Sequence, residues 1–173
     1  MAIHIIIDGY NLIRQSKTLR ILDQQDIQLG RDGLVDILAA YKKIKPHRIT
    51  VVFDGGKFPI FTQPRHRQRG IFIIFSRGGE SADTLIKKMA RKEREKALVV
   101  SSDQDIIRSA ATHGAATIDA GDFETKLSMA LYTETMEING GDHGGWYPTT
   151  KKKGPSRRPS KRKRRNRAKI QKL

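Results

Sequence analysis

Five short apolar runs recur along the chain, and each ends at a polar or turn-forming residue. They lie at residues 3–7, 49–53, 71–75, 97–101 and 115–118, and most are rich in β-branched side chains. Runs of this length and composition are typical of buried β-strands. Because apolar residues occupy both alternating faces, the pattern predicts a parallel sheet that is covered by helices on both sides.

Between these runs, apolar residues recur at the spacing of an amphipathic helix. Residues 34–44 form one such segment, which stops before Pro46. Another follows Gly78-Gly79, a third ends at His113-Gly114, and a fourth starts at Asp122. Residues 12–30 show no clear period, so we expect a loop with a short helix there. The alternation of strands and helices predicts an α/β domain of right-handed β-α-β units.

Acidic residues follow three of the predicted strands, and others open the helices that leave the same edge of the sheet. The carboxyl ends of parallel strands share one edge, where open α/β sheets bind their ligands. We therefore expect the acidic side chains to converge. The candidates are Asp8, Asp54 and Asp103 after strands, and Glu80, Asp83 and Asp105 in the first turns of helices.

Two interpretations of these acids stay open at this point. Asp8 can simply form the turn into the next helix, and first-turn acids such as Glu80 and Asp83 are favoured by the helix dipole alone. Alternatively, the carboxylates gather and repel one another, which a bound divalent cation relieves. Oxygen ligands without a histidine or cysteine set favour Mg²⁺ or Mn²⁺.

The net charge of +16 is concentrated at one end of the chain. Residues 151–173 hold 13 Lys and Arg and no acid, whereas residues 1–150 hold 21 Lys and Arg against 18 Asp and Glu. Such a block is typical of polyanion binding, and we expect it to be disordered when free. Residues 57–70 form a second basic stretch, with Phe58 and Phe61 interleaved. It fits a flexible phosphate-contacting loop, and it equally fits a plain solvated loop that two aromatic side chains anchor. The candidate contacts are Lys57, Arg65, Arg67, Arg69, Lys151, Lys152, Lys153, Arg157, Arg158, Lys161, Arg162, Lys163, Arg164 and Arg165.

Several classes of protein are excluded by what the sequence lacks. There is no cysteine, hence no disulfide framework or thiolate metal site, and no apolar run approaches the length of a membrane span. The start of the chain lacks the features of a signal peptide, so we expect a soluble cytoplasmic protein. No P-loop or nucleophile elbow is present. Carboxylate-held divalent ions beside basic segments instead favour phosphodiester hydrolysis.

Three motifs resemble those of NYN domains of the YacP-like family, a branch of the PIN-like nuclease superfamily. They are Asp8-Gly9-Tyr10-Asn11, Glu80-Ser81-Ala82-Asp83 and Ser101-Ser102-Asp103-Gln104-Asp105, in that order, within residues 3–135. The resemblance implies a three-layer PIN-like fold with about five parallel strands, a Mg²⁺ or Mn²⁺ site, and cleavage of mRNA in association with the ribosome. The pure basic run of the tail departs from the family pattern.

The resemblance also implies roles for individual residues. Asp8, Asp83, Asp103 and Asp105 would form the metal site, and Asn11 would orient Asp8 or a bound water. Glu80 and Asp54 rank second as metal ligands. Val52-Phe53-Asp54-Gly55 is also similar to a segment of flap endonucleases, in which that aspartate belongs to the metal site.

The sequence thus predicts a nuclease domain at residues 1–137, a glycine-rich linker at 138–150 and a basic tail at 151–173. The expected activity is that of a divalent-metal-dependent endoribonuclease. Two alternatives stay open: a non-catalytic RNA- or ribosome-binding protein with the same fold, and a structure-selective DNA nuclease. The oligomeric state has no sequence signal.

Overall fold

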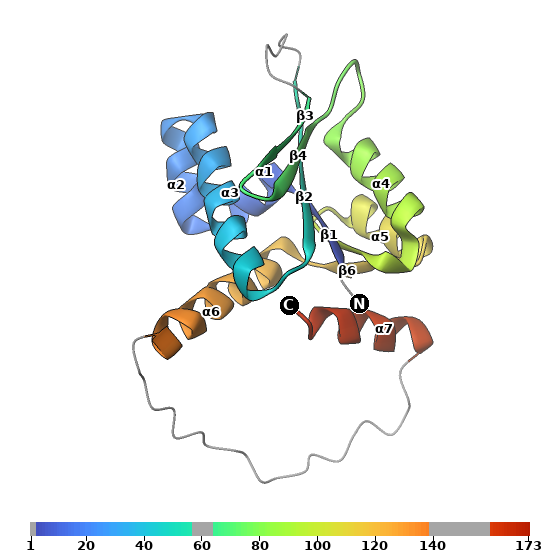
Figure 1. Cartoon of the computed structure of the whole chain (residues 1–173). Coiled ribbons are helices and arrows are strands. Elements are labelled where there is room, and N and C mark those ends of the chain that lie inside the picture. The colour runs from blue at the N-terminus through green and yellow to red at the C-terminus, as the bar shows by residue number, and fades with distance from the viewer. Residues whose placement is uncertain (1–2, 57–63, 139–159) are drawn as a thin grey trace.

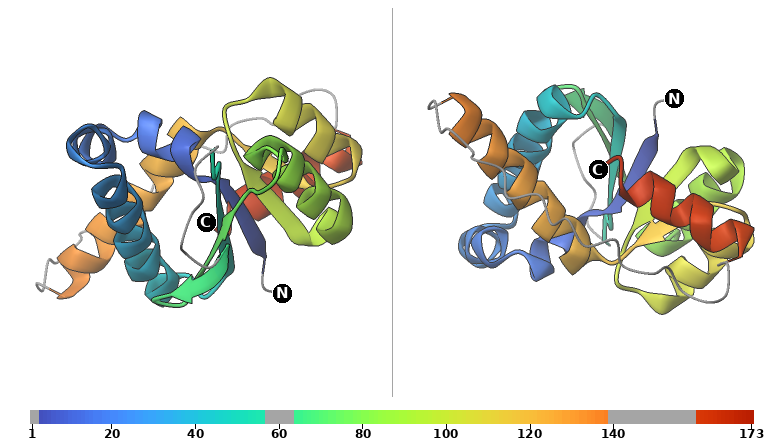
Figure 2. Two further views of the ribbon diagram at one scale, coloured as in Figure 1. Left: turned by 90° about the horizontal axis from the view of Figure 1, so that it is seen from above. Right: turned by 90° about the horizontal axis from the view of Figure 1, so that it is seen from below.

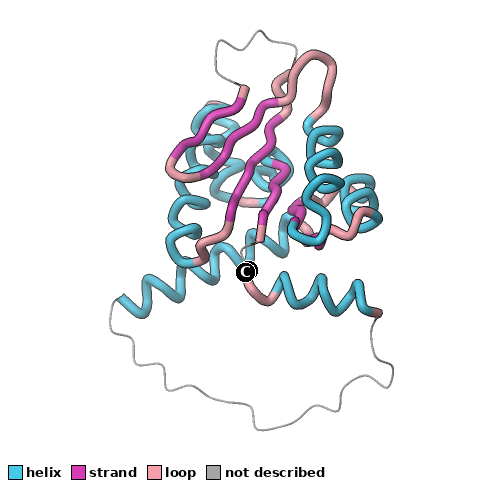
Figure 3. Tube along the Cα trace, turned by 45° about the vertical axis from the view of Figure 1, so that its right-hand side comes forward, coloured by secondary structure: helices cyan, strands magenta, loops and turns pink. Residues whose placement is uncertain are grey.

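A six-stranded sheet runs through the middle of the computed structural model, which describes residues 3–56, 64–138 and 160–173 (Figure 1). The strand order is β3-β4-β2-β1-β5-β6, and every neighbouring pair is parallel except β3 and β4. The predicted α/β class is confirmed, with a mixed sheet in place of a purely parallel one. The strands are β1 (His4–Asp8), β2 (Arg48–Phe53), β3 (Arg65–Gln68), β4 (Ile71–Phe75), β5 (Ala97–Val100) and β6 (Ala116–Ile118), and Figure 3 shows them side by side.

Helices cover both faces of the sheet, so the domain has three layers (Figure 2). Alternate residues of β1 serve the two cores: Ile5 and Ile7 pack into one, and Ile6 packs into the other. All three are fully buried, as a two-sided parallel strand requires. One layer holds α1 (Gly9–Gln15), α2 (Lys17–Gln25), α3 (Ile27–Ile44) and α6 (Ala120–Ile138), and the other holds α4 (Ala82–Glu93), the short 3₁₀ helix η1 (Arg94–Lys96) and α5 (Gln104–Thr112).

A loop with a short helix was expected at residues 12–30, and the loop is wrong, because α1, α2 and the start of α3 occupy this stretch. Each helix begins at a side chain that accepts a hydrogen bond from its first turn. Asp8 caps α1, Ser16 caps α2, and Asp26 caps α3 by accepting from the Gln28 N–H at 2.6 Å. For the short helices α1 and α2, and for the first turns of α3, capping residues replace a long apolar period as the signal.

The expected flexible loop at residues 57–70 is wrong for the part that the structure describes. Residues 65–68 form the antiparallel edge strand β3, in which Arg65 and Arg67 are exposed. The Arg67 guanidinium lies 5.2 Å from the centre of the Phe72 ring, and Arg69 forms a 2.8 Å ion pair with Asp36. Lys57 lies outside the described residues.

The predicted disordered tail is wrong at its end. Helix α7 (Lys161–Ile170) packs against β6, and Leu173 is 7% exposed in the core beyond it. The Tyr41 hydroxyl donates to the Leu173 carbonyl at 3.0 Å, and burial raises the pKa of Tyr41 to about 12. Lys151, Lys152, Lys153, Arg157 and Arg158 lie outside the described residues, as does nearly all of the predicted linker.

No helix in the described ranges has the length and apolarity needed to cross a membrane.

The start of α1 packs so closely on β2 that a side chain does not fit at Gly9. An added Cβ would lie 2.3 Å from Phe53 Cε1 and 2.9 Å from Val51 Cγ1. Phe53 is also held between the Tyr10 and Phe75 rings, so it cannot move aside easily. This glycine allows α1 to leave the strand directly after Asp8.

Replacing Gly9 by alanine should therefore lower the free energy of unfolding by about 1–3 kcal/mol, the usual cost of overpacking a core. Urea denaturation measures this loss. The exposed α2 residue Gln24 supplies the control, since Gln24→Ala should change stability by less than about 0.5 kcal/mol. Equal stability of the two variants would contradict the tight packing of α1 on β2.

Candidate active site

The register of the parallel strands brings the acidic motifs to one edge. Ile7 pairs with Val51 on one side and with Val100 on the other, so β1, β2 and β5 end within about two residues of one another. Asp8 terminates β1, and the loop to α5 begins directly after Val100. Helix α4 packs against β1, which carries its first turn to the same edge.

Asp8 is a half-buried carboxylate with a second carboxylate near it. One oxygen accepts from the Asn11 backbone N–H at 3.4 Å, and the other accepts from the Ser101 hydroxyl at 3.3 Å. Burial raises the pKa of Asp8, and the charge of Asp83 adds to the rise. The two hydrogen bonds and the charge of Arg14 act in the opposite direction but do not cancel it. Asp8 therefore forms the turn into α1 and also faces another acid.

Asp83 does not cap its helix, although the sequence left that role open. The cap of α4 is Ser81, whose hydroxyl oxygen accepts from the Thr84 N–H at 3.2 Å. Asp83 is left half-buried beside Asp8 with no local hydrogen bond recorded for its carboxylate among the described residues. Glu80 forms an ion pair with Lys88.

Asp103 and Asp105 stand at the start of α5 and differ in role. Asp103 caps α5, accepting from the backbone N–H groups of Asp105 at 2.7 Å and Ile106 at 3.3 Å. Asp105 is exposed and forms an ion pair with Lys87 of α4. This bond raises the pKa of Lys87, and the charges of Asp83 and Asp103 add to the effect. All three acids, Asp83, Asp103 and Asp105, thus raise the pKa of Lys87.

Ser101 ties the strand ends together, and nothing but its place in the third motif marked it in the sequence. It is fully buried; its hydroxyl donates to Asp8 and accepts from the Asp103 N–H at 3.1 Å. The side chain of Asn11 accepts from the Ser102 N–H at 2.9 Å. Asn11 therefore holds the β5–α5 loop through its side chain and reaches Asp8 only through its backbone.

Asp54 is not drawn into this network. It is exposed at the end of β2 and accepts from the Gly56 N–H at 2.9 Å, which makes a local turn. Among the described residues no contact joins it to another acid.

A second feature missed by the sequence analysis is a guanidinium held on aromatic rings beside the start of α1. Arg31 of α3 donates to the Tyr10 hydroxyl at 2.9 Å, and its guanidinium carbon lies 5.5 Å from the Tyr10 ring centre and 5.0 Å from that of Phe75. No carboxylate pairs with Arg31 in the part of the chain that the structure describes. A fixed, half-buried cation without a counter-charge is suited to an anionic ligand.

The donor chemistry of the edge fits a hard divalent cation. Asp8 and Asp83 supply carboxylate oxygens, and the buried Ser102 hydroxyl lacks a hydrogen-bond partner among the described residues. Within the same residues, however, no three His, Asp or Glu side chains form a ready cluster for a metal ion. The pair Asp8–Asp83 is therefore the part of the predicted metal site that the structure brings together.

Known proteins share both the sequence pattern and the fold. The family model of the YacP-like NYN domain matches residues 5–171, which includes α7. Protein YacP of Bacillus subtilis (strain 168) is 30% identical over 87 residues, which cover 50% of this chain and 51% of that protein. The chain thus matches about half the length of this relative.

Crystal structures give the same result for the fold. Rae1 (YacP) from Bacillus subtilis superposes with a TM-score of 0.66 at 25% identity, over 81% of each chain. A point mutant of that protein gives a TM-score of 0.66 at 22% identity, over 82% of this chain and 86% of that one. Since the family match spans nearly the whole sequence, the protein belongs to the YacP-like NYN family, a nuclease-type family of the PIN-like superfamily.

Proposed function

We propose that the protein is a divalent-metal-dependent endoribonuclease whose active site is the edge formed by Asp8, Asp83 and Asp103. One observation carries this proposal: Asp83 is held beside the desolvated Asp8 although Ser81 already caps its helix. Two half-buried carboxylates that repel each other lower the stability of the fold. No capping role of Asp83 explains why it lies there. Membership of a nuclease-type family supports hydrolysis as the purpose.

Asp8 and Asp83 would hold the metal, with Asp103 contributing the carboxylate oxygen that does not cap α5. When bound, Mg²⁺ or Mn²⁺ supplies a water of lowered pKa and a positive charge for the scissile phosphate. Lys87 would balance the neighbouring acids. Because Asp105 already pairs with Lys87, we assign Asp105 to the margin of the site.

Ser101 and Asn11 act as positioning residues. The Ser101 hydroxyl fixes one oxygen of Asp8, and the Asn11 side chain fixes the loop that carries Asp103. Arg31 would bind a phosphate of the RNA, because its guanidinium is pre-oriented by Tyr10 and has no carboxylate partner among the described residues. The family resemblance further leads us to propose mRNA, in association with the ribosome, as the cellular substrate.

A non-catalytic RNA-binding protein is the second candidate, and two observations favour it. Lys87 already neutralises Asp105, and the described residues contain no ready three-acid metal cluster. The third candidate, a DNA nuclease, rested on Asp54, which stands apart from the other acids.

Replacing Asp83 by asparagine separates the first two candidates. The amide keeps the size of the side chain and disturbs no helix cap, but it removes a negative charge that would hold the cation. Single-turnover RNA cleavage with Mn²⁺ should slow by at least about 100-fold, while RNA affinity stays near that of the parent chain and the melting temperature in EDTA does not fall.

The matched control is Asp122→Asn, which removes an exposed acid from the first turn of α6. This control should cleave at the parent rate. Parent-like cleavage by Asp83→Asn would contradict the proposed site, and absence of cleavage by the parent chain would favour the binding protein.

The raised pKa of Asp8 gives a pH-dependent prediction for the metal-free protein. Burial raises this pKa above its ordinary value of 3.8, so the native state holds the proton more tightly than the unfolded chain. The stability from this group is present below 3.8 and is lost as the pH rises through the native pKa. Asp8→Asn, which stays neutral, should therefore melt higher than the parent chain at neutral pH.

Thermal unfolding in EDTA from about pH 4 to about pH 7.5 tests this, and the advantage of the variant should shrink toward the acid end. Asp122→Asn again controls for the loss of one negative charge. A variant that melts lower than the parent at neutral pH would show that the hydrogen bonds to Asp8 outweigh its desolvation.

A further inference from the structure

The groove between α5 and α7 carries a charge excess that the acid edge does not explain. We infer that it binds the phosphate backbone of base-paired RNA, at a place separate from the acid edge. This inference rests on the proposed function only in taking RNA as the ligand, because the groove supplies affinity and no chemistry.

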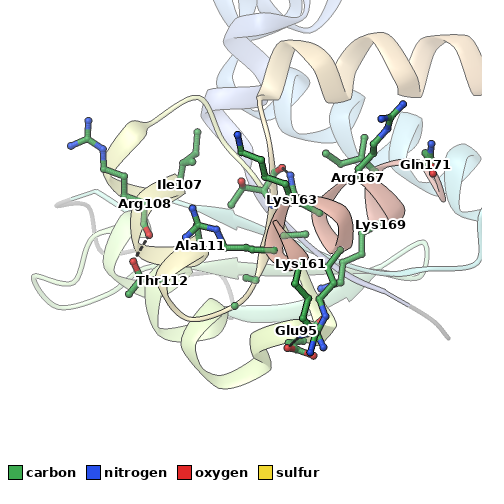
Figure 4. A pocket seen from close by; sticks show the side chains of 18 residues that line it. Glu95, Ile107, Arg108, Ala111, Thr112, Lys161, Lys163, Arg167, Lys169 and Gln171 are labelled. Atoms are coloured by element: carbon green, nitrogen blue, oxygen red, sulfur yellow. Dashed lines mark hydrogen bonds and ion pairs between the residues drawn. The ribbon is translucent and has the colours of Figure 1, made fainter. Parts of the chain in front are cut away.

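The groove has a volume of about 990 Å³ and is lined by α5, β6, α7, the turn from α5 to β6 and Glu95 of η1 (Figure 4). Seven Lys and Arg side chains line it, six from α7 and Arg108 from α5. Among the described lining residues Glu95 is the single acid. Figure 4 shows Arg108 at one margin and Arg167 at the other, with Lys161 and Lys163 between them. This makes a cationic band across two elements that are far apart in sequence.

Most of these cations have no side-chain partner within the described ranges. Arg165 forms an ion pair with Glu95, and Lys169 donates to the backbone carbonyls of Glu95 and Ala97. For Arg108, Lys163 and Arg167 no side-chain hydrogen bond or ion pair is recorded among the described residues. Like charges spaced four residues apart, such as Lys163 and Arg167, repel each other on the same helix face and destabilise the helix. An anionic ligand would relieve that repulsion.

The groove is preformed because α7 is fixed to the edge of the sheet. The Asn166 side chain accepts from the Thr117 N–H at 2.7 Å and donates to the Thr117 carbonyl at 3.2 Å, so it pairs with β6 as a neighbouring strand would. Leu173 anchors the far end in the core. The cations of α7 are therefore held by a helix that is packed on the sheet, and they do not belong to a free polycationic segment.

The lining chemistry selects phosphates over bases. No aromatic side chain lines the groove among the described residues, whereas proteins that bind single strands stack bases on aromatic rings. Paired RNA keeps its bases stacked inside and presents phosphates outward, and proteins recognise it by shape and backbone. A groove of Lys and Arg without aromatic rings fits that form of RNA.

The position of the groove allows both sites to act on one RNA. Helix α5 begins at the acid edge next to Asp103, and its last residues, Ala111 and Thr112, line the groove. Ile107 and Arg108, in the middle of α5, line it as well, so the groove starts roughly one helical turn beyond the acid edge. A paired segment held in the groove leaves the acid edge open to an adjoining strand.

Fluorescence anisotropy in EDTA tests the inference, with a labelled RNA duplex of about 16 base pairs and a single strand of equal length. Arg108→Gln should weaken duplex binding by several fold, and Lys163→Gln/Arg167→Gln by about tenfold, with the salt slope reduced by about one for each cation removed. Asn166→Ala keeps every charge but releases α7 from β6, and it should also weaken duplex binding. The control Lys17→Gln/Arg20→Gln removes two exposed cations from α2 and should leave affinity unchanged.

Parent-like duplex binding by Arg108→Gln would overturn the inference, because a free basic tail needs no residue of α5. Equal losses in the α2 control and in Lys163→Gln/Arg167→Gln would overturn it too, as would tighter binding of the single strand than of the duplex. If Asn166→Ala does not fold, Arg108→Gln decides alone. Cleavage of an unpaired RNA by the parent chain, measured separately with Mn²⁺, reports on the acid edge, so failure of the groove and failure of the nuclease assignment give different results.

Discussion

The shared register of the parallel strands β1, β2 and β5 is the constraint on which the candidate site depends. Because Ile7 pairs with both Val51 and Val100, Asp8 emerges beside the β5–α5 loop. The buried Ser101 hydroxyl then links Asp8 to the backbone of Asp103, and Asn11 holds the loop from the other side. A slip of one residue in this register would turn Asp8 to the opposite face of the sheet and separate these groups.

Electrostatic strain at this edge is balanced by stability elsewhere. Asp8 and Asp83 are partly desolvated near each other, while Lys87 moderates the neighbouring acids from α4. The rigid layers on both sides of β1 hold the pair in place, which is how folded proteins retain unfavourable arrangements at functional sites. Along the middle and later part of α5 the imbalance has the opposite sign, since the groove under α7 gathers cations with a single acid among its described lining residues. The molecule thus separates an acidic edge from a basic groove along one short helix.

The parallel strands could be predicted because their apolar runs are continuous. The acidic edge could be predicted because acids follow these runs and the carboxyl ends of parallel strands share one edge. Helices α1 and α2 could not, since their signal is a cap, Asp8 or Ser16, and few apolar positions. Helix α7 was beyond prediction for a related reason: its apolar side chains are few, and the contact of Asn166 with the edge strand has no pattern in sequence. Sequence could place Asp83 near the site but could not exclude a capping role, which the bond from Thr84 to Ser81 assigns to another residue.

The most direct test of the account is the crystal structure of the protein soaked with Mn²⁺, read by anomalous scattering at the manganese edge. We expect one strong peak between the carboxylates of Asp8 and Asp83, and its loss in the Asp83→Asn variant. A peak bound elsewhere, or an empty edge at a Mn²⁺ concentration that supports RNA cleavage, would contradict the assignment of these two carboxylates as the metal site.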